Sequence, residues 1–206
     1  MNDLATLLVR LVQGALLGGH GAQKLFGHFE GPGLEGTAGF MEMLGLRPGR
    51  PWAILAGISE FGGGVLTVLG LLNPLGPVGI IGSMSMATAR AHWGKPIWVT
   101  EGGAELPVTN SAISTALILN GPGKYSLDRA LGIRLPAWVA SLGLAVIILT
   151  LLYVGVKRHQ TRTKRARSWP ERNRSSRSAP RLTCAETSQP TFAEGLRRGG
   201  RRRCPQ

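Results

Sequence analysis

Long apolar runs alternate with short segments rich in glycine, proline and charge along the first three quarters of the chain. Each run except the fourth reaches or nearly reaches the ~20 residues that a helix needs to cross a hydrocarbon layer of about 30 Å. The runs are 4–26, 51–72, 74–93, 107–120 and 136–156. The fourth, 107–120, is the weakest, because it is polar and is short unless it begins near Gly103. We therefore predict an all-α membrane protein, a four-helix transmembrane bundle plus a fifth C-terminal transmembrane helix, with four crossings as the alternative to five.

The segments between the runs predict how the helices are connected. Residues 37–44 form a short amphipathic stretch that suits a helix lying at the membrane surface. The Asn73–Pro74 turn leaves little room between the second and third runs, so these helices should be antiparallel neighbours. Small residues recur every four positions on two helices, as Gly14 and Gly18 on the first and Gly79, Ser83, Ala87 and Ala91 on the third. Such faces allow helices to pack closely within a membrane.

The composition changes sharply after Val156. Residues 157–206 hold 15 of the 24 Lys and Arg residues but only three acids, which leaves +12 of the net charge of +13. Because this segment has few apolar residues that could form a core, it should be a disordered basic tail. We expect three parts: a bundle at 1–132, an additional helix at 133–156 and the tail. Both cysteines, Cys184 and Cys204, lie in the tail, where a disulfide would join only tail to tail, and no metal site is predicted.

Charge also predicts the orientation of the chain. Basic residues follow the last run directly, and such residues favour the cytoplasmic side of the membrane. Five crossings would then place the N-terminus outside, although Lys124, Arg129 and Arg134 on that side weaken the asymmetry. The first residues lack the basic start and cleavage site of a secretory signal, so we expect the first run to be retained as a helix of a multi-pass protein.

Ionisable residues within the runs are the candidate functional groups. Such groups are costly in a membrane, so they usually face the interior of the bundle, where they are paired. In the first run, the polar residues lie three or four positions apart, or seven apart on either side of Leu17, and therefore share one helical face. They are Arg10, Gln13, His20 and Lys24. The second run carries one charge, Glu60, and the third ends with Arg90 and His92. The candidate catalytic cluster is Glu60, Arg10, His20, Lys24, Arg90 and His92.

Helix rise gives a rough depth for each group. Measured from the N-terminal side, Glu60 should lie about 18 Å deep, Arg10 about 9 Å, and His20 and Arg90 about 24 Å. These three cations are therefore the predicted partners of Glu60. Lys24, Arg90 and His92 lie near the membrane boundary, where long side chains also reach the interface for ordinary reasons. The alternative is that the Glu60 and Arg10 charges only fix helix packing.

Several short motifs occur together in a specific order. They are His20-Gly-Ala-Gln-Lys-Leu-Phe-Gly27, Gly36-Thr-Ala-Gly-Phe40, Leu44-Gly-Leu46, Glu60-Phe-Gly-Gly63, His92, and Gly121-Pro-Gly-Lys-Tyr-Ser-Leu-Asp128. This set resembles the DoxX family over roughly residues 4–132. The resemblance implies a bacterial or archaeal plasma-membrane protein of four helices. Relatives are described as small subunits of quinone-linked oxidoreductases, including thiosulfate:quinone oxidoreductase, or as a membrane partner of a superoxide dismutase and a sulfur transferase. The last run and the tail depart from the family pattern.

These observations lead to competing functional hypotheses. The first is a subunit of a quinone-linked or oxidative-stress and sulfur-metabolism oxidoreductase, with a quinone pocket between the basic end of the cluster and the loop at 101–105. The second is a non-catalytic scaffold that recruits soluble redox proteins to the membrane, alone or as a homo-oligomer. A small transporter is less favoured. Haem is not favoured, because each helix carries a single histidine, and nucleic-acid binding by the tail is not favoured because stacking aromatics are few.

Overall fold

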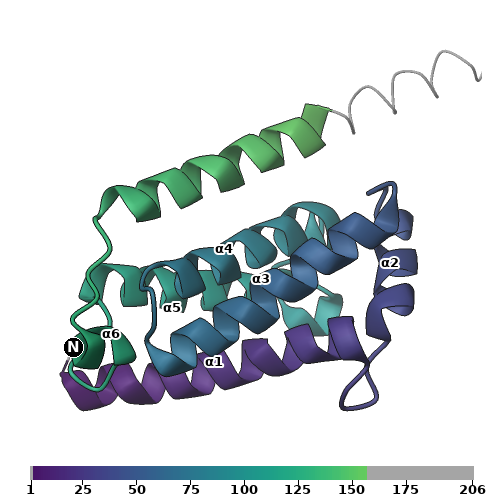
Figure 1. The fold of residues 1–206 in the computed structure, drawn as a ribbon. Coiled ribbons are helices and arrows are strands. Elements are labelled where there is room, and N and C mark those ends of the chain that lie inside the picture. The colour runs from purple at the N-terminus through teal and green to yellow at the C-terminus, as the bar shows by residue number, and fades with distance from the viewer. Residues whose placement is uncertain (1, 157–206) are drawn as a thin grey trace, which may run out of the picture. The chain divides into compact units, whose positions relative to one another are not determined.

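The computed structural model describes residues 2–156, and within this range the chain forms helices and connecting segments without a strand (Figure 1). The helices are α1 (Asp3–Phe26), α2 (Gly33–Met43), α3 (Gly49–Leu69), α4 (Leu75–Ala87), α5 (Glu105–Asn120), α6 (Leu127–Leu131) and an unlabelled last helix (Trp138–Val156). A π-helical turn, η1 (Thr88–His92), continues α4, and a short 3₁₀ turn, η2 (Val99–Glu101), precedes α5. The predicted disordered tail, its placement and both cysteines lie outside the described residues.

The all-helical prediction is confirmed, and the helices lie close to the predicted runs. α3 ends at Leu69 rather than 72, because Gly70 adopts a left-handed conformation with φ 61° that stops the helix. Two short helices complete the pattern: α2 is longer than the amphipathic stretch that predicted it, and α6 was not predicted. Two helices, Gly49–Leu69 and Trp138–Val156, are long and apolar enough to cross a membrane. The four or five crossings stay a prediction.

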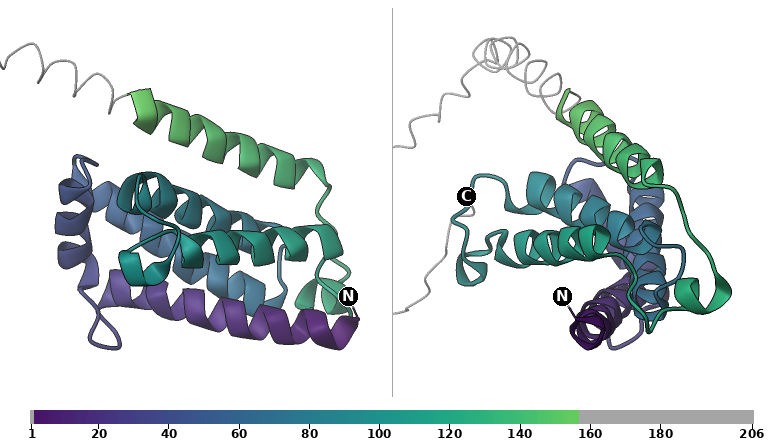
Figure 2. Two further views of the ribbon diagram at one scale, coloured as in Figure 1. Left: turned by 180° about the vertical axis from the view of Figure 1, so that it is seen from behind. Right: turned by 90° about the vertical axis from the view of Figure 1, so that its left-hand side faces the viewer.

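Four long helices pack around one another. α1 packs on α3, α3 on α4, α4 on α5, and α5 on α1, while α2 contacts α1 and α3. Both Figure 1 and the left view of Figure 2 show α2 standing across the ends of these helices. We call this end of the molecule the α2 end, and the opposite end, where α6 lies, the α6 end.

Glycines set the register between α1 and α3. A Cβ on Gly14 would lie only 2.7 Å from the carbonyl oxygen of Gly64, and a Cβ on Gly21 would overlap the backbone of Phe61. Further along, Gly57 of α3 faces Leu25 of α1. The two helices are therefore antiparallel, with residue 14 level with 64–68 and residue 21 level with 61. This close approach is what the Gly14–Gly18 face predicted.

The α3–α4 pair shows the predicted antiparallel packing. A Cβ on Gly63 would lie 2.9 Å from the carbonyl oxygen of Gly76, and a Cβ on Gly79 would lie 3.3 Å from that of Ser59. The small-residue face of α4 thus lies against α3, as expected. Ser83 belongs to this face, one turn beyond Gly79, and its side chain reaches Glu60 of α3.

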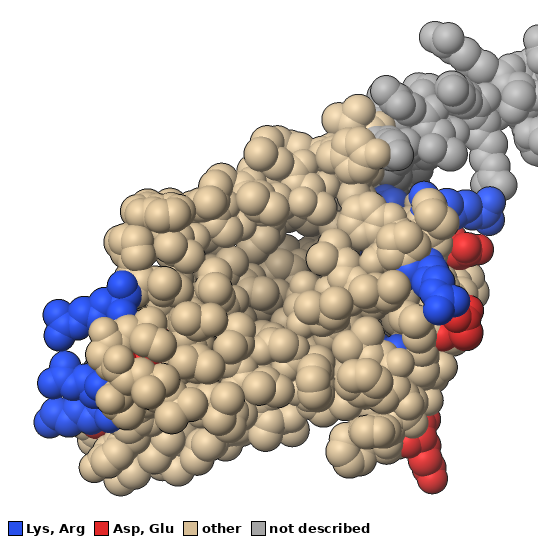
Figure 3. Space-filling view, viewed as in Figure 1, with Lys and Arg blue, Asp and Glu red and all other residues tan. Residues whose placement is uncertain are grey.

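Apolar side chains are exposed along the length of the long helices. On the face shown in Figure 3, charged side chains gather at the two ends, and the band between them carries none. The last helix is the most exposed, with Leu149, Leu152 and Val156 all more than half accessible. It contacts the rest of the chain through a few side chains, including Ile147 beside Gly82 and Val154 in the apolar cluster formed by α2 and α3.

Candidate functional site

A buried carboxylate, Glu60, lies in the middle of α3. Its residue is 1% exposed, and its Oε1 atom accepts from two groups on two other helices. Lys24 Nζ, in the last turn of α1, forms an ion pair with Oε1, and Ser83 Oγ of α4 donates to the same oxygen at 2.5 Å. Three helices therefore meet at one carboxylate oxygen. We call Lys24, Glu60 and Ser83 the Glu60 site.

The second carboxylate oxygen of Glu60 is different. Oε2 is buried and has no hydrogen-bond partner among the described residues. Buried polar atoms are nearly always hydrogen-bonded, because an unpaired one carries the full cost of desolvation. An unpaired carboxylate oxygen at such a position calls for an explanation such as a ligand that donates to it.

Accessibility differs sharply across the ion pair. The Lys24 side chain is 30% exposed, whereas the Glu60 side chain is 2% exposed. Lys24 lies at the α2 end, and Thr37 Oγ1 of α2 donates to the Lys24 carbonyl at 3.3 Å and to the Gly33 carbonyl at 2.7 Å. The C-terminal end of α1 also favours a cation there, because the helix dipole is negative at that end. The Glu60 site is therefore reached from the α2 end, through the ammonium group.

Arg10 is not a partner of Glu60, which corrects the sequence prediction. Its side chain is buried, and it donates to four backbone carbonyls: Thr67 at 2.9 Å, Val68 at 2.8 Å, Pro122 at 2.8 Å and Tyr125 at 2.9 Å. The first two are carbonyls of the last turn of α3, where the Thr67 carbonyl also accepts from the cap residue Gly70 N at 3.2 Å. The fork of guanidinium donors therefore ties the end of α3 to the loop after α5. The role of Arg10 in this structure is a backbone clamp.

His20 lies on the exposed side of α1, so the prediction that it pairs with Glu60 is also wrong. Its Nδ1 atom is 3.1 Å from the side-chain oxygen of Gln23. Gln13, by contrast, is buried as the seam predicted, and its Nε2 donates to the Asn110 carbonyl at 2.8 Å and to Ser114 Oγ at 3.0 Å. The polar face of α1 is therefore shared between α3 and α5 rather than gathered around one carboxylate.

Arg90 and His92 lie in the π-helical turn η1. Arg90 Nη2 donates to the Gly45 carbonyl at 3.3 Å, and His92 Nδ1 is 2.7 Å from the Gly102 carbonyl. A π turn contains more residues than an α turn, so it moves both side chains around the helix axis from the positions that α-helical spacing predicts. His92 thus meets the loop that was predicted to face the cluster, while the ion pair of Glu60 is formed by Lys24.

The predicted six-residue cluster is therefore divided. Lys24 and Glu60 form one site, and Arg10, His20, Arg90 and His92 bind other groups. Ser83 was missed as a site residue, although its position on the small-residue face of α4 placed it against α3. Two hollows occur at the α6 end, one of about 10 Å³ beside Arg10 and one of about 750 Å³ beside Asp3 and Arg129. Within residues 2–156, no group of three His, Cys, Asp or Glu side chains is arranged to hold a metal ion.

The fold and the site define a class of protein: a helical bundle with an apolar exterior and a buried ion pair. The DoxX family profile matches residues 5–93, which run from α1 through η1 and include both Lys24 and Glu60. The resemblance to the DoxX family is therefore confirmed over these residues. Comparisons with curated proteins and with solved structures find no match.

Proposed function

We propose that this protein is a multi-pass membrane subunit of a quinone-linked oxidoreductase, in which the Glu60 site exchanges protons with a quinone head group. The observation that carries the proposal is the buried Oε2 of Glu60, which has no hydrogen-bond partner in the described chain.

Membrane placement accounts for the surface of the bundle. Large apolar side chains on the outer side of α1, such as Leu8, Val12 and Leu16, are more than half exposed. Arg10 and Gln13 on the same helix are buried. Arg10 and Gln13 lower the mean hydropathy of α1, but they are buried and would not contact lipid. This distribution supports five crossings by α1, α3, α4 with η1, α5 and the last helix.

The crossing lengths fit this placement. The 24 residues of α1 span about 36 Å and the 18 residues of Leu75–His92 about 27 Å. α5 has 16 residues, or about 24 Å, and is the shortest of the five. With basic residues after Val156 on the cytoplasmic side, the α2 end faces the cytoplasm of a bacterial cell. Lys24 then opens toward that compartment.

Quinone chemistry needs what the Glu60 site offers. Reduction of a quinone to a quinol takes up two electrons and two protons, so the site must deliver protons to the two quinone oxygens. A carboxyl group with one oxygen held by Lys24 and Ser83 can carry a proton on the other oxygen and give it to a bound acceptor. Lys24, which is partly exposed, links this carboxyl group to water. The electrons come from an external reductant, and thiosulfate is the class that the family resemblance implies.

The test is quinone reduction in membranes that contain the full chain. With thiosulfate as reductant and a soluble quinone as acceptor, Glu60→Gln should lower turnover by about 10²-fold or more, because the proton-exchanging group is lost. Glu35→Gln is the matched control, since Glu35 pairs with Arg50 at 2.7 Å and both side chains are well exposed. Equal turnover in these two variants, each recovered as folded protein, would exclude the proposal.

A scaffold is the second candidate. The Lys24–Glu60 pair joins two helices, and a buried ion pair can act only by fixing how helices pack. In that case the exposed α2 end would recruit soluble redox proteins, and Glu60→Gln would leave turnover unchanged while altering recovery of partners from mild detergent. Purification of the tagged protein alone, at every expression level, would argue against the scaffold.

A further inference from the structure

The larger hollow lies at the α6 end and has no role in the proposed function. It has a volume of about 750 Å³ and is lined by the start of α1, the loop before α4, the loop after α5, α6 and the segment that leads to the last helix. This volume lies within the range of pockets that hold small molecules. Figure 3 shows Lys and Arg side chains gathered at the end where α6 lies.

The charges around this hollow favour an anion. Five charged residues line it: Asp3, Lys124, Asp128, Arg129 and Arg134. Asp128 is buried and already accepts from two backbone groups, Leu72 N at 2.7 Å and Asn73 N at 2.8 Å. Its carboxylate is therefore used inside the protein and does not offer a cation site to solvent.

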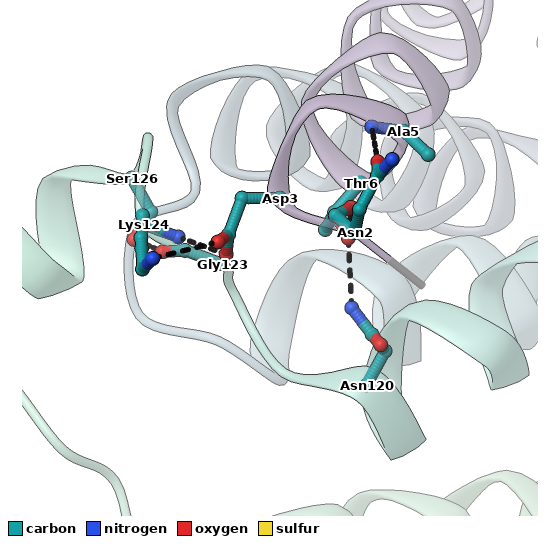
Figure 4. Close-up of polar contacts among 8 residues, drawn as sticks. All are labelled: Asn2, Asp3, Ala5, Thr6, Asn120, Gly123, Lys124 and Ser126. Carbon is teal, nitrogen blue, oxygen red and sulfur yellow. Dashed lines mark hydrogen bonds and ion pairs between the residues drawn. The ribbon is translucent and has the colours of Figure 1, made fainter.

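Asp3 is used in a similar way. Its Oδ1 accepts from Lys124 N at 2.9 Å, and its Oδ2 lies 3.4 Å from Lys124 Nζ (Figure 4). Asp3 is thus an anion that is matched by Lys124.

Two cations then remain. Arg129 and Arg134 are exposed, and no ion pair joins either of them to a carboxylate of residues 2–156. Both residues line the hollow. A guanidinium group binds phosphate through two parallel hydrogen bonds, which makes arginine a preferred residue for phosphate recognition.

The walls of the hollow are also held in place. Asn120 Nδ2 donates to Thr6 Oγ1 at 2.8 Å, and Asn2 caps α1 by accepting from Ala5 N at 2.8 Å (Figure 4). Arg10 adds its bonds to the carbonyls of Pro122 and Tyr125. The loop after α5 is thus fixed to the start of α1. Arg129 and Arg134 come after this loop in the sequence, so the contacts that fix the loop also help to fix their position.

Exposed aromatic residues place the hollow at the level of lipid headgroups. Tyr125 is 60% exposed in the loop after α5, and Trp138 is 63% exposed at the start of the last helix. Tyrosine and tryptophan concentrate at the interface between membrane and water. From the charges, the volume and this position, we propose that the hollow binds the phosphate of an anionic phospholipid headgroup through Arg129 and Arg134. This proposal rests on the membrane placement but not on quinone chemistry.

Lipid retention on the full chain tests the proposal. The protein would be purified in mild detergent with phosphatidylglycerol, and the fraction of chains that carry a bound lipid measured by native mass spectrometry. Each basic residue near an anionic surface contributes about fivefold to affinity, so Arg129→Gln with Arg134→Gln should weaken retention about thirtyfold. The matched control is Arg47→Gln with Lys95→Gln, which removes the same charge from exposed positions outside the hollow. The basic tail is the same in all three proteins.

The outcomes separate the sources of phosphate. Selective loss of phosphatidylglycerol in the Arg129/Arg134 variant, with retention in the control, supports a headgroup site. Equal retention in both variants would overturn it. A second arm uses inorganic phosphate with the protein in zwitterionic lipid: if phosphate raises the melting temperature of the wild type alone while lipid retention is equal, the lipid assignment is wrong. Quinone turnover of the Arg129/Arg134 variant, measured in parallel, distinguishes this failure from failure of the proposed function.

Discussion

Lys24 and Glu60 form an ion pair in which the cation is partly exposed and the carboxylate is sealed within the bundle. The pair joins the last turn of α1 to the middle of α3, and it uses one of the two carboxylate oxygens. Ser83 supplies the second donor to that oxygen. Stability and function therefore depend on the same few atoms, which makes the contribution of each measurable by substitution.

Removing only the cation should be more harmful than removing both charges. Lys24→Met leaves the Glu60 carboxylate buried without its cation, and breaking a buried pair in this way costs about 3–5 kcal/mol. The double variant Lys24→Met with Glu60→Gln removes the unpaired charge and should recover much of the loss. Thermal unfolding in detergent measures both. A double variant no more stable than Lys24→Met would show that the charge imbalance is not the cause.

The register of α1 and α3 should be sensitive to Gly64 and insensitive to Gly62. A Cβ on Gly64 would meet the backbone of Gly14 and Gly18, whereas a Cβ on Gly62 would meet nothing within 4 Å. We expect Gly64→Ala to cost about 1–3 kcal/mol through forced separation of the helices. Gly62→Ala, on the same helix, should be neutral or stabilising. Unfolding in mixed micelles compares the two directly, and equal effects would contradict the close-packing account.

Arg10 should not be replaceable by lysine. Lysine keeps the charge, but its single ammonium group cannot reproduce the fork that donates to four carbonyls on two segments. Loss of bonds to a charged donor should cost about 3 kcal/mol, and amide hydrogen exchange should rise in the loop after α5. Arg47→Lys, at an exposed position, is the control. Unchanged exchange in that loop would mean that the clamp does not hold it.

The sequence predicted the helices well because exposed and buried apolar positions together form clear apolar runs. The inward position of Gln13 and Glu60 followed from the same reasoning, since a membrane leaves polar groups nowhere else to go. The Asn73–Pro74 turn and the small residues of α4 correctly predicted the α3–α4 packing. These features depend on local sequence and on periodicity.

The partner of Glu60 could not be predicted in the same way. The depth estimate assumed that α1 and α3 start and end at common levels, whereas glycine contacts set their register and bring Glu60 closer to Lys24 than to Arg10. The four acceptors of Arg10 are backbone carbonyls, which no side-chain pattern reveals. The π turn that carries Arg90 and His92 likewise depends on tertiary packing rather than on spacing.

The unequal exposure of Lys24 and Glu60 gives the bundle a sidedness. Under the membrane placement proposed above, water has access to the ion pair through the partly exposed Lys24 side chain at the α2 end, which faces a single compartment. In a closed vesicle, an acid pulse would therefore reach this carboxylate from one face only. A redox reaction coupled to it would consume protons from that face, and it would respond to a transmembrane pH difference according to the direction in which the protein is inserted.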